Sequence, residues 1–263
     1  RFGIGYAPES WATLTGDTSL KSADLIGAGL ACQRTNSKGA YDVFRGRILF
    51  PVHNNAGNVV GFSGRLLAGA GPKYLNTEET ALYHKGSVLF GLTQARNAIR
   101  KTGRVVVVEG VFDVITPSQN GFEHLVSTCG TALTLEQITL LFAVSKQIVF
   151  CFDGDPAGAK ATWRAAEMLV EKLTDLHEVR LCTLPAEHDP DTLVRAEGID
   201  RLAALVDNAP TLTHYLADVI TRGARLPEAK ARSLVKAKAL CQRFASPLMA
   251  TFFRQHICEH LGL

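Results

Sequence analysis

The stretch QIVFCFDGDPAGAKA, residues 147–161, decides the fold class. Its first six residues are almost all apolar, which indicates a buried strand. Two aspartates separated by one glycine follow, Asp153 and Asp155, and then comes Pro156. Aspartate is a favoured helix N-cap and proline is favoured at the first helical position. The stretch is therefore expected to form a strand, an acidic turn and a helix from Pro156 to about Leu173.

The same alternation of strand and helix continues on both sides of this stretch. Apolar runs at residues 104–110, 124–130 and 178–184 predict three more strands, and helical patterns separate them. Nearly continuous runs of Val, Ile, Leu and Phe that alternate with helices indicate a parallel sheet with helices on both faces. We therefore predict one α/β unit over residues 104–195.

The flanking segments have other patterns. Residues 47–67 hold two apolar runs around an Asn-Asn-Ala-Gly turn, which predicts a β-hairpin. From Asp191 onward every segment has a helical pattern, and Pro or Gly separates the segments. The predicted fold is α/β (α+β overall), with a basic α+β subdomain over residues 1–103 before the α/β unit and a helical bundle over residues 196–263 after it.

Composition excludes several classes of protein. With 46% hydrophobic residues in 263, the chain can bury a sizeable core. No apolar run approaches the roughly 18 residues of a membrane span, and the start has no basic-then-apolar leader, so we expect a cytoplasmic protein without membrane contact. The six cysteines are scattered without a C-x-x-C pair, which argues against a disulfide framework and a zinc ribbon. We expect them to be small buried apolar residues.

The net charge of +3 hides a strong segregation along the chain. Residues 1–104 hold 13 Lys and Arg against 6 Asp and Glu, residues 105–198 hold 6 against 14, and residues 199–263 hold 9 against 5. An acidic segment between basic ones suits a site that holds divalent cations with its carboxylates and a polyanion with its flanks. Ordinary solvated surface charge gives the same counts.

Carboxylates follow three of the four predicted strands. Ligands bind at the carboxyl ends of the strands in an open parallel sheet, so these residues are expected to meet at one edge. Helix capping is an alternative role for Asp155 and Asp191, and Asp113 has the alternative of favouring a helix N-terminus. Capping does not account for Glu109 and Asp153, which close strongly apolar strands, where a carboxylate is costly unless solvated or paired. The six candidates are Glu109, Asp113, Asp153, Asp155, Asp189 and Asp191.

Gathered carboxylates raise one another's pKa unless a cation neutralises them. Hard oxygen ligands without well-placed His or Cys favour Mg²⁺ or Mn²⁺ over Zn²⁺. One segment keeps zinc as an alternative, because HICEH at residues 256–260 fits an H-x-x-E-H pattern. No glutamate follows it as a third ligand, so an amphipathic bundle helix is the favoured interpretation.

Three of these segments, VVVVEGVFDVI, FCFDGDPAGAKA and HDPDTLV, resemble the acidic motifs of the Toprim domain, which occurs in bacterial primases, type IA and II topoisomerases and some nucleases. RFGIGYAPESW, FRGRILFPVHNNAGNVVGFSGR, PKYLN and HKGSVLFGLTQA are similar, in the same order, to the motifs ahead of Toprim in DnaG-type bacterial primases. The resemblance covers most of residues 1–200 and weakens in the helical tail. EGVFD differs from the commoner EGYMD only between the acids.

The resemblance implies an RNA polymerase core that copies a single-stranded DNA template into a short RNA primer from ribonucleoside triphosphates. Glu109 matches the family's glutamate, a general base or metal organiser, and it is expected to be catalytic together with Asp153 and Asp155. All six carboxylates match metal-binding positions. The residues expected along the nucleotide and template path are Arg47, Arg65, Lys73 and Lys85, with Tyr74 either stacking on a base or packing in the core.

DnaG-type primases also carry a zinc-ribbon domain and a helicase-binding domain, and neither is visible in this chain. Zinc and the replicative helicase are therefore expected only through those domains. Two rival functions use the same features. A Toprim nuclease would cleave phosphodiesters with the same acids, whereas a non-catalytic module that grips single-stranded DNA would need the basic flanks but not the acids. A topoisomerase would need a nucleophilic tyrosine, and none of the five tyrosines has such a context.

Overall fold

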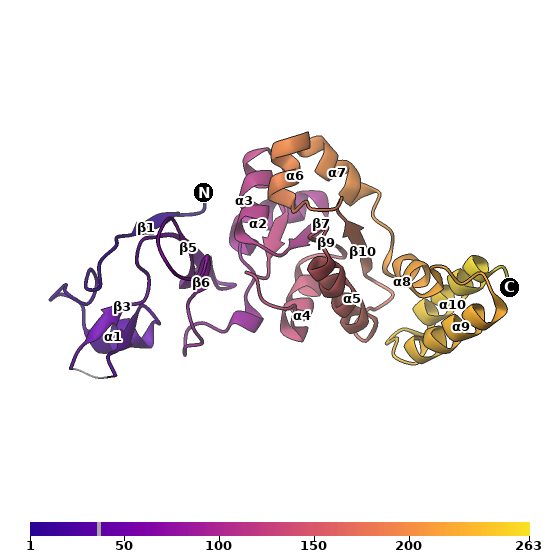
Figure 1. Ribbon diagram of the computed structural model, residues 1–263, viewed down its shortest axis with the longest axis horizontal. Helices are drawn as coiled ribbons and strands as arrows, with labels where there is room; N and C mark the ends of the chain where they lie inside the picture. The colour runs from indigo at the N-terminus through magenta and orange to yellow at the C-terminus, as the bar shows by residue number, and fades with distance from the viewer. Residues whose placement is uncertain (36–37) are drawn as a thin grey trace.

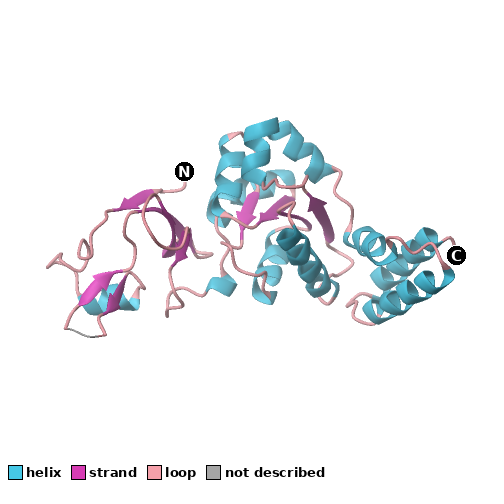
Figure 2. Cartoon of the chain, in the orientation of Figure 1, coloured by secondary structure: helices cyan, strands magenta, loops and turns pink. Residues whose placement is uncertain are grey.

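The computed structural model describes residues 1–35 and 38–263. Three groups of elements follow one another along the long axis of the molecule (Figure 1): a β-rich N-terminal part, a central sheet flanked by helices, and a C-terminal group of helices. Figure 2 shows that the strands are confined to the first two of these groups.

The central sheet is parallel, in the order β10-β9-β7-β8. Its side chains alternate between two apolar cores. On β7, Val105 and Val107 belong to one buried cluster, whereas Val106 and Val108 belong to the other. This alternation confirms the predicted parallel sheet with helices on both faces. The strands are β7 (Arg104–Val108), β8 (Leu125–Ser127), β9 (Gln147–Phe152) and β10 (Glu178–Thr183).

Three helices cover each face of this sheet. One face carries α2 (Leu92–Thr102), α4 (Leu135–Val144) and α5 (Pro156–Val170), and the other carries α3 (Val111–Gln119), α6 (Pro190–Glu197) and α7 (Ile199–Asp207). The prediction that residues from 196 onward belong to the bundle differs from the structure at α7. Leu202 and Val206 are fully buried in the cluster that contains Val149 of β9. Helix α7 therefore packs with the parallel sheet and not with the C-terminal bundle.

The N-terminal part is built on an antiparallel sheet in the order β1-β4-β5-β6, and the predicted hairpin of β4 and β5 is confirmed. Asn54 closes its turn by accepting hydrogen bonds from the backbone N–H groups of Ala56 and Asn58, both at 3.0 Å. Phe50 and Val52 join the cluster that contains Val106, so the hairpin packs against the central part. The elements are β1 (Gly5–Ala7), α1 (Ser22–Gly27), β2 (Ala31–Gln33), β3 (Ala40–Asp42), β4 (Arg47–His53), β5 (Val59–Leu66), β6 (Tyr74–Asn76) and the 3₁₀ helix η1 (Lys85–Ser87).

The C-terminal helices are α8 (Leu212–Thr221), α9 (Pro227–Cys241) and α10 (Pro247–Leu261). Their apolar residues, among them Leu216 and Phe253, share one buried cluster with α5. Arg243 adds ion pairs to Glu167 at 3.2 Å and to Glu171 at 3.0 Å on the α5 side. In the ranges described, no helix is long and apolar enough to cross a membrane.

The cysteines of the described chain form no disulfide. Cys129, Cys151 and Cys182 are buried as expected. Cys258 is exposed on α10, so the expectation that all six cysteines are buried is wrong.

Candidate active site

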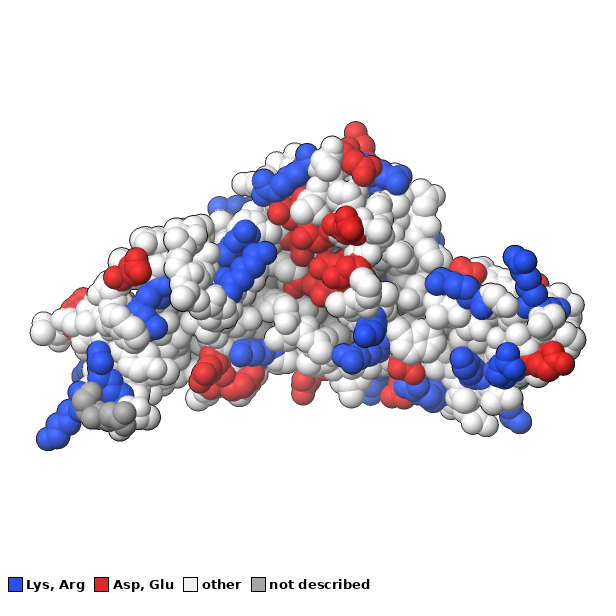
Figure 3. Space-filling model, viewed as in Figure 1, with Lys and Arg blue, Asp and Glu red and all other residues white. Residues whose placement is uncertain are grey.

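A cavity of about 620 Å³ lies between the antiparallel sheet and the carboxyl edge of the parallel sheet. Acidic residues line one side and basic or polar residues line the other. Figure 3 shows acidic side chains gathered at the centre of one face, next to basic side chains on the N-terminal part. The acids that line the cavity are Glu109, Asp113, Asp153, Asp189 and Asp191, and Arg65, Lys73 and Tyr74 line it from the N-terminal part.

Glu109 comes directly after β7, where its backbone is held in place. Its carbonyl oxygen accepts hydrogen bonds from Ser127 Oγ at 2.6 Å and from the Gly130 N–H at 2.9 Å. The Asp153 N–H lies 3.4 Å from Glu109 Oε1, which brings the ends of β7 and β9 together. Burial raises the pKa of Glu109, and the charge of Asp155 raises it further.

Asp153 follows β9 at the centre of the acidic side. Its Oδ1 is buried and has no hydrogen-bond partner among the described residues. Burial raises the pKa of Asp153 to about 7, and the nearby charges of Glu109, Asp113 and Asp189 act in the same direction. A buried carboxylate oxygen without a partner is costly, so this position is suited to a cation.

Asp113 lies in the first turn of α3, which follows β7, and it is only 6% exposed. It accepts hydrogen bonds from the N–H of Gly110 at 2.8 Å and from the N–H of Asp191 at 3.3 Å. The first bond caps α3, so Asp113 does stabilise a helix N-terminus, which was the alternative role that the sequence offered for it. Burial raises the pKa of Asp113 to about 7, and the charges of Asp189 and Asp191 add to the shift.

Each of the three remaining acids contacts a residue of helix α5 or α6. Asp155 caps α5 by accepting the N–H of Gly158 at 2.7 Å, and it is not among the residues that line the cavity. The cap of α6 is Asp189, which accepts the N–H of Thr192 at 2.7 Å, and not Asp191 as the sequence suggested. Asp191 instead forms an ion pair with Arg195 at 2.7 Å.

Gly154 is a point of close approach between the acidic loop after β9 and the acidic loop after β10. Its N–H donates to the carbonyl oxygen of His188 at 2.9 Å, and a Cβ at this position would lie 2.0 Å from the carbonyl oxygen of Pro185. The loop after β9 therefore runs directly against the loop after β10, which brings Asp153 and Asp189 to the same cavity.

The opposite side of the cavity is cationic and aromatic. Arg65 of β5 donates to the Tyr74 hydroxyl at 3.3 Å, and its guanidinium lies 4.5 Å from the ring centroid of Phe112. Asn76 donates to the carbonyl oxygen of Cys129 at 3.0 Å. The sequence motifs contain Phe112 and Asn76, but nothing in a single sequence indicated that they line the site.

Two predicted path residues lie elsewhere. Arg47 is buried, donates to the carbonyl oxygen of Gly64 at 3.1 Å, and lines a second cavity of about 400 Å³ together with Trp11. Lys85 lies in η1 beside α4, where its carbonyl oxygen accepts a hydrogen bond from Gln137 Nε2 at 3.2 Å. Neither residue lines the acidic cavity.

The donors at the acidic edge fit a hard divalent cation. Within residues 1–35 and 38–263, no three His, Cys, Asp or Glu side chains converge closely enough to cage an ion by themselves. Mg²⁺ does not require such a cage, because it keeps several waters and takes only one or two carboxylates. The unsatisfied Oδ1 and the raised pKa of Asp153 are the features that a bound cation would relieve. The HICEH segment instead lies on the amphipathic helix α10, with Phe253 and Ile257 buried.

We expect Asp153→Asn to stabilise the metal-free chain at about pH 8. The pKa of Asp153 is about 7 in the folded protein against an ordinary 3.8, so the ionised carboxylate opposes folding above pH 7 and protonation relieves this at lower pH. The melting temperature should rise by roughly 2–4 °C, for a gain of about 1 kcal/mol in the free energy of unfolding. The gain should shrink by about pH 5.5, and thermal melts in EDTA measure it. A variant that melts lower than the parent at both pH values would contradict the claim that burial and the neighbouring carboxylates oppose ionisation of Asp153.

Two family models match the chain in succession. The DNA primase catalytic core N-terminal domain matches residues 1–96, and a Toprim-like domain matches residues 106–194. The DNA primase of Pseudomonas putida is 38% identical over 268 residues, which cover 100% of this chain and 41% of that primase. The chain thus spans less than half the length of this relative.

Two solved structures of related primases superimpose on the whole length of this chain. A DNA primase domain from Pseudomonas aeruginosa superimposes with a TM-score of 0.92 at 38% identity, covering 100% of this chain and 84% of that domain. A DnaG primase catalytic domain bound to single-stranded DNA gives a TM-score of 0.91 at 34% identity, covering 100% of this chain and 83% of that domain.

Proposed function

Because the chain belongs to the DnaG-type family of DNA primases, we propose that it is a metal-dependent core that synthesises short RNA primers on single-stranded DNA. The observation that carries this proposal is that carboxylates from three strand ends face Arg65 and Lys73 in one cavity. Such a cavity offers one side to divalent cations and the other to phosphates.

The carboxylates have separable roles in this proposal. Asp153, with its unsatisfied Oδ1, and Asp113 and Asp189 beside it would hold Mg²⁺ or Mn²⁺, assisted by Asp155 and Asp191. When bound, the ions supply positive charge that lowers the pKa of the attacking hydroxyl and stabilises the phosphate oxygens and the pyrophosphate leaving group. Glu109 has a raised pKa and lines the cavity, which suits it to accept the proton of the 3′-hydroxyl.

The cationic side would bind the triphosphate and the template backbone. Arg65 is oriented by the Tyr74 hydroxyl and the Phe112 ring, so it can present two N–H donors to a phosphate, and Lys73 adds a charge. The complex of the related catalytic domain with single-stranded DNA supports a single-stranded template. The buried Arg47 and the distant Lys85 would act on the template outside this cavity.

We expect Arg65→Ala to weaken nucleotide use much more than it slows the chemical step. Loss of a charge-assisted phosphate contact of about 1.5–3 kcal/mol should raise KM for ribonucleoside triphosphates roughly 10- to 100-fold. Steady-state kinetics on one template measure this, with Lys101→Ala, an exposed cation at the end of α2, as the charge-matched control. Equal KM values for Arg65→Ala and Lys101→Ala would remove Arg65 from the nucleotide site.

The remaining assignments are also proposals. Residues 1–103 would bind template and nucleotide, residues 104–195 would carry the metal chemistry, and residues 196–263 would support them, with α7 packed on the catalytic sheet. In the whole protein, zinc would be held by a separate zinc-ribbon domain, and the replicative helicase would be a partner through a separate helicase-binding domain. The cytoplasmic location expected from the sequence stays a prediction.

The function is tested by ribonucleotide incorporation on unprimed single-stranded DNA with Mg²⁺, with Mn²⁺ and with EDTA. Template-dependent RNA that forms only with a divalent ion is the expected result. Metal-dependent cleavage of the DNA without RNA synthesis would move the assignment to a Toprim nuclease. Binding of DNA that is unaffected by EDTA, with neither reaction, would indicate a non-catalytic DNA-binding module.

A further inference from the structure

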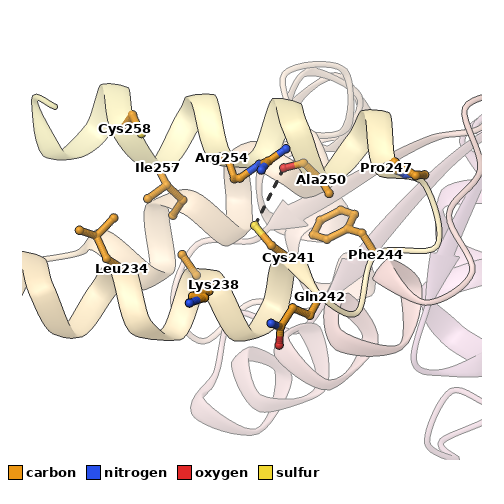
Figure 4. Close-up of a pocket in the computed structure, with 11 residues that line it drawn as sticks. Leu234, Lys238, Cys241, Gln242, Phe244, Pro247, Ala250, Arg254, Ile257 and Cys258 are labelled. Carbon is orange, nitrogen blue, oxygen red and sulfur yellow. Dashed lines mark hydrogen bonds between the residues drawn. The ribbon is translucent and has the colours of Figure 1, made fainter.

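An apolar groove of about 680 Å³ runs between α9 and α10, far from the acidic cavity. Figure 4 shows the two helices side by side, with side chains from both and from the turn between them directed into the groove. Its floor is buried and apolar, formed by Ala237, Phe244 and Ile257. Leu234 at its edge is 38% exposed.

The polar residues of the groove are cationic or neutral. Lys238 and Arg254 line it from opposite helices, and none of its described lining residues carries a carboxylate. Neither cation makes an ion pair within the described part of the chain. Among the described residues, the one hydrogen-bond acceptor of the Arg254 guanidinium is Thr251 Oγ1, at 2.9 Å. Two cations at the border of an apolar floor offer charge-assisted hydrogen bonds to a ligand that combines apolar side chains with carboxylates.

The occupant that this chemistry fits is an acidic amphipathic helix of a partner protein. Residues 227–261 hold six Lys and Arg against two Glu, so a symmetric contact that places this face of one copy against the same face of another would be repulsive. Nucleic acid would match the charge, but Phe244, the aromatic ring of the lining, is only 9% exposed and offers little surface for base stacking. The segment from Leu234 to Cys241 spans about 10 Å of α9, which suits two to three turns of a helix laid in a groove.

We propose that the α9–α10 groove is a docking site for an acidic amphipathic helix from a partner protein. Leucines on one face of that helix would cover Ala237, Phe244 and Ile257, while its flanking carboxylates would pair with Lys238 and Arg254. This inference is independent of the proposed catalytic function, because the groove shares no residue with the acidic cavity.

The test uses three fluorescein-labelled peptides of about 15 residues with leucines at i, i+3, i+4 and i+7. The peptides are identical except that the flanking residues are Glu, Gln or Lys. Fluorescence anisotropy with the purified chain should give the tightest binding for the Glu peptide and the weakest for the Lys peptide. Lys238→Glu and Arg254→Glu should each weaken the Glu peptide at least roughly tenfold.

The matched control is Lys236→Glu, an exposed cation of α9 that does not line the groove, and it should leave the affinity unchanged. Absence of saturable binding of the Glu peptide up to about 1 mM would overturn the proposal. Equal effects of Lys236→Glu and Arg254→Glu would do the same, because binding would then follow net charge alone. If no peptide bound but a single-stranded oligonucleotide lost affinity with Lys238→Glu and Arg254→Glu, the groove would be a nucleic-acid surface instead.

Discussion

Glu109→Gln and Asp153→Asn should each reduce RNA synthesis by about 100- to 10,000-fold. Both substitutions keep the shape of the side chain and remove the negative charge. Glu109 would lose its capacity to accept a proton, and Asp153 would lose the ionised oxygen that has no partner among the described residues. Incorporation of radiolabelled ribonucleotides on unprimed DNA measures the loss, and unchanged far-UV circular dichroism shows that the fold persists.

The control for these two variants is Asp200→Asn, which removes the charge of an exposed carboxylate in the first turn of α7. It should synthesise RNA at the parent rate, because Asp200 does not line the cavity. Full activity in either Glu109→Gln or Asp153→Asn would mean that the acidic edge is not the reaction centre.

Gly154→Ala should be as damaging as loss of an acid, although it removes no functional group. The added Cβ would lie 2.0 Å from the carbonyl oxygen of Pro185 and would force the loops after β9 and β10 apart. Overpacking of this kind costs about 1–3 kcal/mol of stability, and it would also displace Asp153 from Asp189. We expect a fall in melting temperature of roughly 2–4 °C per kcal/mol, and RNA synthesis below 1% of the parent, that is about a 100-fold loss or more.

Gly27→Ala is the matched substitution for this experiment. Among residues 1–35 and 38–263, a Cβ on Gly27, at the end of α1, would meet no atom within 4 Å beyond its chain neighbours and its own helix backbone, so the chain should keep its stability and its activity. If Gly154→Ala melted and synthesised RNA like Gly27→Ala, the close approach of the two acidic loops would not be needed for function.

The parallel sheet and its acidic edge could be predicted because each depends on local sequence. Four apolar runs alternate with helical patterns, and the strand direction then places every strand end at one edge. The position of α7 could not be predicted in the same way. An amphipathic helix has the same pattern whether its apolar face covers a sheet or another helix, so only the packing of Leu202 and Val206 assigns it.

The contrast between Arg47 and Arg65 has a similar cause. In the hairpin, Arg47 pairs with Leu66 and Ile48 pairs with Arg65. Residues directly opposite each other share a face and successive residues alternate, so the two arginines point to opposite faces of the sheet. The strand register decides which of them reaches the acids, and two adjacent apolar runs in a sequence do not specify that register.

The most direct measurement of the central claim is Mn²⁺ binding to the chain by isothermal titration calorimetry, repeated with Asp153→Asn and Asp200→Asn. If the acidic edge holds the ion, the parent and Asp200→Asn will bind Mn²⁺ with the same affinity, and Asp153→Asn will bind at least roughly tenfold more weakly. Equal affinity in all three proteins would contradict the claim that Asp153 and its neighbours form the metal site.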